Sequence, residues 1–155
     1  LAIVGGSAFT DDYVAELKQL SDGDDSIVMT GSQTGDVLHE LFANAYAAIH
    51  PSTSEGLPIA VLEEMSYGKC VLSSDIPENT ELTERHGLIF ETGNVDELAE
   101  GIIMMAESPE LVDHVGYEAA EHVNRNYNWD EIALMTDQLY RETLQKPIPI
   151  PLKAK

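Results

Sequence analysis

Short apolar runs alternate with amphipathic segments along the first 91 residues of the chain. The short runs predict β-strands at residues 1–6, 26–31, 46–52, 69–75 and 87–91. Segments whose apolar residues recur at helical spacing predict helices at residues 11–21, 35–45 and 59–68. The first strand is expected to be buried and to end at Gly5 and Gly6, which we interpret as turn residues.

Three further helices are expected in the last third of the chain, at residues 94–108, 109–127 and 128–145. Asn94 or Asp96 suits the start of the first of them, and Pro109 suits the first turn of the second. Strands that alternate with helices indicate a parallel sheet that is covered on both faces. The sequence therefore predicts an α/β fold, a Rossmann-like doubly wound parallel sheet with additional C-terminal helices.

The two ends of the chain carry different signals. The chain opens on Leu1 and runs directly into an apolar segment, so we expect a piece of a longer protein whose sheet lacks its first strand. Near the other end, prolines occupy alternate positions, a pattern that helices and central strands do not accept. We therefore assign residues 1–146 to one domain and residues 147–155 to an extended tail or linker.

The acidic composition narrows the classes of partner. The 155 residues include 28 acidic and 8 basic ones, which gives a formal charge of −20. Such a surface repels nucleic acid and anionic membranes, so a nucleic-acid partner is not expected. No apolar run approaches the ~20 residues that span a bilayer, and no signal-peptide pattern is present. We expect a cytoplasmic location, with a membrane-peripheral one for the full-length protein as the alternative.

Metal and disulfide chemistry find little support in the sequence. The chain has one cysteine, Cys70, which cannot form an internal disulfide and fits a reducing compartment. Cys70 lies in an apolar run, so we expect it to be a buried core residue. The five histidines show no metal-ligand spacing with cysteine or with one another. Neither a metal nor a cofactor is therefore expected.

Two carboxylates, Glu55 and Glu63, flank the expected start of a helix near Pro58. In parallel sheets ligands bind at the carboxyl ends of the strands, so the loop that follows the strand ending at His50 lies on the ligand side. A helix N-terminus carries partial positive charge and suits a phosphate. Carboxylates accept hydrogen bonds from sugar hydroxyls. This layout matches ribose, two phosphates and a hexose, although the spacing alone favours two solvent-facing glutamates.

The segment HPSTSEGLPIAVLEEMSYGKCVLSSDIPE, residues 50–78, carries a more specific signal. It resembles the C-terminal, donor-binding half of retaining GT-B glycosyltransferases of the group 1 family, in its family-4-like branch. The matching motifs are Pro51-Ser52, Glu55-Gly56, Leu62-Glu63-Glu64-Met65, Gly68, Ser74-Asp75 and Pro77-Glu78. The resemblance extends over nearly the whole chain, through GLIFETGNVDELAEGI and YNWDEIA.

The resemblance implies roles for residues on both sides of Pro58. Glu55 would contact hydroxyls of the transferred sugar and is the one candidate catalytic residue, without being a nucleophile. The backbone amides that would face the sugar and the diphosphate are those of Gly56, Leu57, Ile59 and Ala60. Glu63 would accept hydrogen bonds from the ribose hydroxyls. Gly31 and Ser32, in the loop Thr30–Gln33, would lie near the base.

The chain also departs from the family pattern. The resemblance implies that the loop that carries an Arg and a Lys in family members would precede Leu1, and we expect the acceptor-binding half to lie outside these residues as well. Glu64 stands where Ala is common, and we expect it to face outward. The isolated chain is therefore expected to be inactive, with the missing N-terminal acceptor-binding domain and a nucleotide sugar as its partners.

The function that this resemblance implies is transfer of a hexose, with retention, from a nucleotide-diphosphate-sugar to an acceptor hydroxyl in polysaccharide biosynthesis. A nucleotide-sugar epimerase of the same architecture is one alternative. A non-catalytic doubly wound binding module is another. A module of the response-regulator type would need an acidic cluster after the first strand and a Lys after the last, and the chain supplies neither there.

Overall fold

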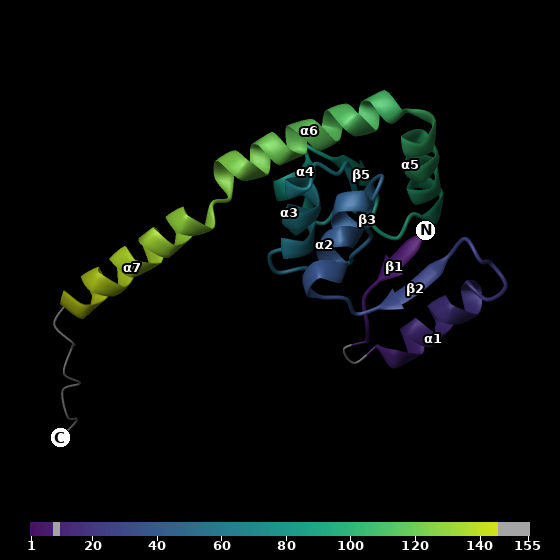
Figure 1. Cartoon of the computed structure of the whole chain (residues 1–155), viewed down its shortest axis with the longest axis horizontal. Helices are drawn as coiled ribbons and strands as arrows, with labels where there is room; N and C mark the ends of the chain where they lie inside the picture. Colours follow the sequence, from purple (N-terminus) through teal and green to yellow (C-terminus); the bar gives the residue numbers. More distant parts are fainter. Residues whose placement is uncertain (8–9, 146–155) are drawn as a thin grey trace, which may run out of the picture. The chain divides into compact units, whose positions relative to one another are not determined.

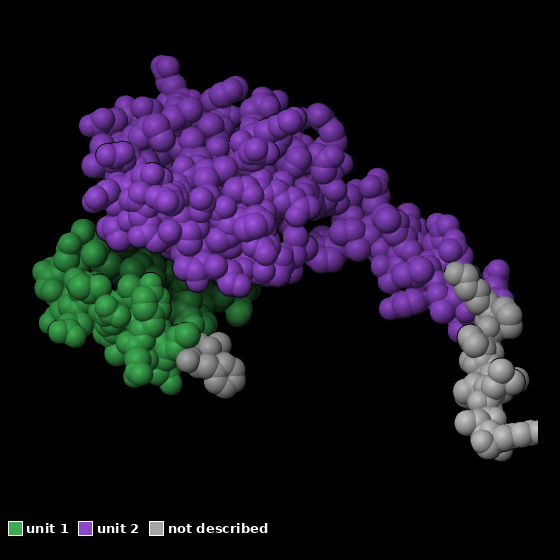
Figure 2. Space-filling model, turned by 180° about the vertical axis from the view of Figure 1, so that it is seen from behind, with its two compact units in different colours: residues 1–46 green, residues 47–155 purple. Residues whose placement is uncertain are grey.

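The structure of the protein is a computed structural model, which describes residues 1–7 and 10–145. The chain divides into two compact units, residues 1–46 and residues 47–155, which Figure 2 shows in separate colours. We call them the N-terminal and C-terminal units. The tail expected at residues 147–155 lies outside the described residues. Among the described helices, none is long and apolar enough to cross a membrane.

The N-terminal unit is a small parallel β-α-β-α arrangement. It contains β1 (Ala2–Val4), α1 (Asp11–Leu20), β2 (Val28–Gly31) and α2 (Gly35–Asn44), and β1 pairs with β2 in parallel. The expectation that the first strand is buried is wrong: none of its residues is buried, and Val4 is 41% exposed. The reason is that β1 and β2 form a sheet of only two strands, which leaves little surface to cover either strand.

The C-terminal unit holds a three-stranded parallel sheet in the order β3 (Ala48–His50), β4 (Val71–Ser74) and β5 (Leu88–Phe90). Its helices are α3 (Ile59–Ser66), α4 (Pro77–Thr83), α5 (Val95–Glu107), α6 (Pro109–Asn126) and α7 (Trp129–Gln145) (Figure 1). Every described strand pairing is parallel, so the expected α/β fold is confirmed. No residue of α7 is buried in the described structure.

Helix α4 was not expected from the sequence, which placed strand 87–91 directly after strand 69–75. The correction follows from the pairing, because β4 and β5 are parallel neighbours and parallel neighbours need a crossover connection. Pro77 occupies the first turn of α4, as prolines at helix starts often do. Two of the three residues that α4 buries, Asn79 and Thr83, are polar, so hydrophobic periodicity did not mark it.

The core of the C-terminal unit forms two clusters that alternate along β4. Val71 packs with residues of α3, α4 and the second half of α6, which are Val61, Met65, Leu82, Ala119 and Val123. Cys70 and Leu72 point to the other side and pack with Phe90, Met105 and Val112. Since neighbouring strand residues face opposite sides of a sheet, both faces are covered. Cys70 is buried as expected, and burial raises the pKa of its thiol to about 11.

Helix α6 contributes to both clusters because it passes close to the turn that leads into β4. Gly68 ends α3 with a φ of +70°, which favours glycine. Gly116, in the middle of α6, lies against the carbonyl oxygen of Gly68 and within 3.2 Å of the Cys70 nitrogen, measured from an ideal Cβ position. Helix α6 therefore crosses at the amino end of β4, whereas the candidate residues lie at the carboxyl ends of the strands.

Candidate functional site

The loop that carries Glu55 connects the carboxyl end of β3 to α3. Pro58 is buried at the start of α3, and its carbonyl oxygen accepts the N–H groups of Val61 and Leu62. The Ile59 N–H donates to the Leu57 carbonyl at 2.8 Å, so that predicted amide already has a partner within the chain. The other predicted amides, of Gly56, Leu57 and Ala60, belong to exposed residues and donate to no described residue.

The charge at the start of α3 differs from that of the other helices. Each of the other described helices carries at least one acidic residue in its first turn, as α1 does with Asp11 and α5 with Asp96. The first turn of α3 carries none. Because an acidic side chain there would partly neutralise the positive end of the helix dipole, α3 keeps this end available in a chain that is otherwise strongly acidic.

The Glu55 side chain is held by a histidine at the end of β3. His50 Nε2 lies 3.1 Å from Glu55 Oε1, and the two side chains are 17% and 28% exposed. The sequence pattern marks His50 only as the end of a strand, and the pair with Glu55 was not predicted. The five-residue spacing fits neither helical nor strand periodicity, so the pairing depends on the path of the loop.

A buried network of polar side chains ties the same loop to α4. Ser74 Oγ donates to the carbonyl oxygen of Ser52, and Asn79 Nδ2 donates to the carbonyl oxygen and to Oγ of Ser74, at 3.3 and 3.0 Å. Asn79 is fully buried, and its Oδ1 and the Ser52 Oγ have no hydrogen-bond partner among the described residues. The network was not predicted. It joins the residues that follow β3 and the carboxyl end of β4 to α4.

The motif residue Asp75, which follows β4, is hydrogen-bonded to the loop that follows β5. Its Oδ1 accepts the backbone N–H and the hydroxyl of Thr92, at 2.8 and 2.6 Å. The Thr92 hydroxyl and then its N–H lower the pKa of the Asp75 carboxyl. Since Asp75 follows β4 and Thr92 follows β5, both ends of this tie lie on the predicted ligand side.

The two consecutive glutamates of α3 have opposite environments. Glu63 is exposed, and its side chain remains a predicted ribose contact. The expectation that Glu64 faces outward is wrong: Glu64 is half-buried, and its Oε2 is buried without a hydrogen-bond partner. Neighbouring residues of a helix point about 100° apart, and Glu64 lies one turn from the buried Val61. Burial, and then the negative charge of Glu63, raise the pKa of Glu64 to about 8.

Glu64→Gln is expected to reduce the dependence of stability on pH. Between the ordinary value of 4.5 and about 8, the folded chain keeps a proton on Glu64 that the unfolded chain has lost. The free energy of unfolding of the wild type therefore falls as the pH rises through this window. Because partial exposure screens the charge, we expect a loss of about 2 kcal/mol from pH 5 to pH 8. Urea unfolding of the chain at both pH values measures it.

The matched control for this prediction is Glu63→Gln, which changes the neighbouring and exposed carboxylate of the same helix. This variant should keep most of the pH dependence. A Glu64→Gln variant whose stability falls between pH 5 and pH 8 as steeply as that of the wild type would contradict the assignment of a buried, proton-retaining carboxyl.

Gly31 and Ser32 lie in the N-terminal unit, at the end of β2. Gly31 has a φ of +69°, and its carbonyl oxygen accepts the Gly5 N–H at 3.0 Å. The Gln33 side chain donates to the Thr30 carbonyl oxygen at 2.7 Å. Side chains and backbone of this loop are thus tied within the unit, while Gly31 and Ser32 themselves are exposed. Their contact with a base stays a prediction.

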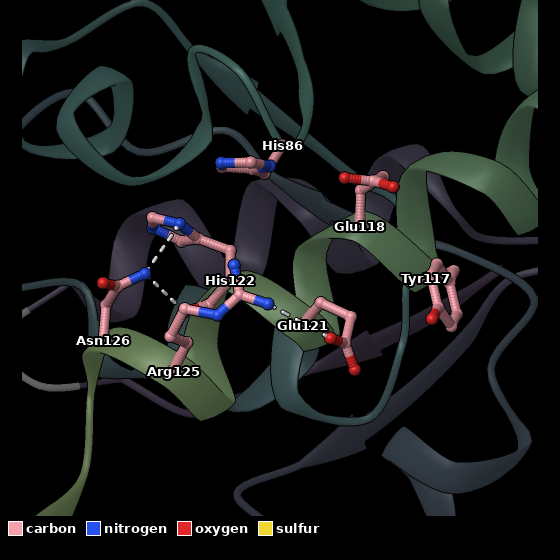
Figure 3. Close-up of a pocket in the computed structure, with 7 residues that line it drawn as sticks. All are labelled: His86, Tyr117, Glu118, Glu121, His122, Arg125 and Asn126. Atoms are coloured by element: carbon pink, nitrogen blue, oxygen red, sulfur yellow. Dashed lines mark hydrogen bonds and ion pairs between the residues drawn. The ribbon is translucent and has the colours of Figure 1, made fainter.

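A separate hollow of about 330 Å³ lies on α6, and Figure 3 shows the residues that line it. The rings of His86 and His122 stack at 4.1 Å, and Arg125 pairs with Glu121 at 3.5 Å. Burial, then the charges of His86 and Arg125, lower the pKa of His122. The hollow contains none of the predicted site residues, and His86 precedes β5, at the opposite end of the strand from the Glu55 loop. In the part of the chain that the structure describes, no three His, Cys, Asp or Glu residues could together hold a metal ion.

Comparison with curated proteins places the chain among glycosyltransferases. An uncharacterized glycosyltransferase of Methanocaldococcus jannaschii is 26% identical over 145 residues, which are 92% of this chain and 37% of that protein. A sulfoquinovosyl transferase of Arabidopsis thaliana is 30% identical over 124 residues, which are 76% of this chain and 24% of that protein. The chain thus spans well under half the length of these relatives.

Solved structures share the fold. Sucrose-phosphate synthase from Thermosynechococcus elongatus is 26% identical, with a TM-score of 0.80 over 93% of this chain and 38% of that one. Anabaena Alr3699/HepE, solved in complex with UDP and glucose, is 24% identical, with a TM-score of 0.78 over 92% of this chain and 39% of that one. Residues 1–108 also match the family described as glycosyl transferases group 1, which covers more than half of the chain. The chain belongs to the glycosyl transferases group 1 family, and its architecture is that of the GT-B glycosyltransferases.

Proposed function

We propose that this chain is the donor-binding part of a longer enzyme that transfers a hexose from a nucleotide-diphosphate-sugar to an acceptor hydroxyl, with retention of the anomeric configuration. The bond from the anomeric carbon to the diphosphate breaks, a bond to the acceptor oxygen forms, and the acceptor's hydroxyl proton passes to the departing diphosphate or to water. The family match supports the reaction class. The chain spans 37% of one relative and 24% of another, so the acceptor site is proposed to lie in the remainder.

The observation that carries the donor assignment is the start of α3. Its first turn lacks acidic residues, and the amides of Gly56, Leu57 and Ala60 donate to no described residue. Together they suit the diphosphate, whose negative charge grows as it leaves. Ile59 is included in the proposed set through its place in the motif, although its N–H is bound to Leu57 here.

The two carboxylates divide the donor between them in this proposal. Glu55 orients the transferred sugar by accepting hydrogen bonds from its hydroxyls. Glu63 accepts from the ribose hydroxyls of the nucleotide, and Gly31 and Ser32 line the base. The UDP found with a fold relative supports a nucleoside diphosphate as the ligand class. We propose no metal or other cofactor: the charge of the leaving diphosphate would be met by helix and backbone dipoles at the start of α3 and by basic residues in the rest of the protein.

We further propose a role in polysaccharide biosynthesis and a cytoplasmic location, in keeping with the free, buried thiol of Cys70. The isolated chain is proposed to be inactive, because the acceptor and the basic loop would come from the rest of the protein.

The test is a screen of UDP-, GDP- and ADP-sugars with the full-length protein and a range of polysaccharide acceptors. The proposal expects release of nucleoside diphosphate together with a new glycosidic bond of retained configuration. Conversion of the donor into an epimeric nucleotide sugar, without release of nucleoside diphosphate, would support an epimerase instead. Binding of nucleotide without turnover of any donor would favour a binding module.

A further inference from the structure

We propose that His50 is a positioning residue, which holds the Glu55 carboxylate in the orientation that the transferred sugar requires. The inference rests on the proposed function and adds to it a residue outside the motif that carries the two glutamates. Its basis is the contact of 3.1 Å between His50 Nε2 and Glu55 Oε1.

The two partners differ in how firmly their backbones are held. His50 is the last residue of β3 and is paired in register with Ser73 of the central strand β4. Glu55 lies in the irregular loop before α3, where no ladder fixes its backbone. Within the described structure, His50 is the one side chain that forms a hydrogen bond or ion pair with the Glu55 carboxylate. Because strand pairing fixes His50, its hydrogen bond also restrains the position of the Glu55 side chain in the loop.

The hydrogen bond with His50 leaves part of the Glu55 carboxylate free to accept hydrogen bonds from a sugar. His50 donates its Nε2–H to Oε1, in either the imidazolium or the neutral form with the proton on Nε2. Oε2 then has no partner among the described residues, and Oε1 keeps a lone pair. A carboxylate fixed on one side and open on the other suits two neighbouring hydroxyls of a sugar ring, because each hydroxyl needs one acceptor.

The loop is already anchored elsewhere, which separates the role of His50 from general folding. Ser74 Oγ donates to the Ser52 carbonyl, and Asn79 in turn donates to Ser74. Pro58 is buried at the far end of the loop. Loss of the His50 contact should therefore free the Glu55 side chain while leaving the backbone path of the loop in place.

The experiment compares two amide variants of the full-length protein, His50→Gln and His50→Asn. The Gln amide can reach the position of Nε2 and donate to Glu55, whereas the Asn amide is one methylene shorter and cannot. We measure kcat and KM for the nucleotide sugar, affinity for the free nucleoside diphosphate, and thermal unfolding. His50→Asn should lower kcat by about 10- to 100-fold, with nucleoside diphosphate affinity unchanged, and His50→Gln should stay within about threefold of the wild type.

A double-mutant cycle completes the test, because residues that act through one another are not additive. In a Glu55→Ala background, His50→Asn should have little further effect on kcat. A His50→Asn enzyme with wild-type kcat, equal losses for Asn and Gln, or a full loss that persists without Glu55 would each overturn the proposal. Failure of the wild type to turn over any donor would instead overturn the proposed function, and the role of His50 with it.

Discussion

Glu55→Ala is expected to lower kcat of the full-length enzyme by about 100-fold, because misplacing the reacting sugar costs roughly this factor. The carboxylate lies in the loop at the carboxyl end of β3, where ligands of parallel sheets bind. Its side chain is 28% exposed and keeps Oε2 without a described partner, so a hydroxyl can reach it. The loss should appear in kcat, while the affinity for free nucleoside diphosphate, which lacks the hexose, stays within about twofold of wild type.

The matched control is Glu84→Ala, which removes an exposed carboxylate that follows α4 in the same unit. It changes the net charge by the same amount and should leave kcat unchanged. If Glu84→Ala and Glu55→Ala lowered turnover equally, the effect would come from the overall charge of −20. A Glu55→Ala enzyme with wild-type kcat would contradict the assignment of this residue to the sugar.

Gly116→Ala is expected to destabilise the chain by about 3 kcal/mol, toward the upper end of the range for overpacked cores. A Cβ at this position would collide with the carbonyl oxygen and carbon of Gly68 and lie 3.2 Å from the Cys70 nitrogen. All three atoms belong to backbone that leads into the central strand, so none can move without shifting β4. The gain in helix propensity from Gly to Ala, about 1 kcal/mol, is too small to offset this.

Gly101→Ala supplies a matched comparison, because Gly101 is also a buried glycine inside a helix, α5. The three atoms nearest to its added Cβ all belong to the Leu72 side chain, the closest being Cδ2 at 2.8 Å, and a leucine side chain can rotate. We therefore expect Gly101→Ala to lose about 1 kcal/mol or less. Urea unfolding of both variants measures the difference, and equal losses would show that the close approach of α6 to Gly68 is not what limits this position.

Much of the fold follows from local signals in the sequence. Asn94 caps α5 by accepting the Glu97 N–H at 3.1 Å, and Gly68 ends α3 in a left-handed conformation, as their positions before and after periodic segments predict. The strand positions of the C-terminal unit followed equally from short apolar runs, because a strand that is covered on both faces is apolar along much of its length. Cys70 is buried for the same reason.

The features that the sequence did not predict depend on tertiary packing. Helix α4 buries Asn79 and Thr83, and polar residues become core residues only when partners such as Ser74 and Ser73 lie opposite them. Glu64 turned out to be half-buried because helix α3 presents it beside Val61, which no motif reveals. The first strand, β1, is not buried as expected because its sheet has only two strands in the described structure.

The candidate site, too, contains residues that the sequence predicted and residues that it did not. The motif identified Glu55 and Glu63 by type and spacing, and the fold places Glu55 in the loop before α3 and Glu63 on an exposed position of that helix. The contact between His50 and Glu55 could not be predicted from the sequence, because a donor and an acceptor five residues apart meet only when the loop between them folds back. The first turn of α3 has no acidic residue, and this difference from the other described helices could be seen only once the bounds of all of them were known.

The most direct test of the donor site is the affinity of the full-length protein for a free nucleoside diphosphate, measured by calorimetry for Glu63→Ala and Glu55→Ala side by side. A hydrogen bond to a charged acceptor contributes roughly 1.5–3 kcal/mol, or about 10- to 150-fold in affinity. Glu63→Ala should lose affinity within this range, and the loss should shrink for a 2′,3′-dideoxyribose analogue, while Glu55→Ala should bind as the wild type does. Equal effects of the two substitutions, or no effect of Glu63→Ala, would contradict the account.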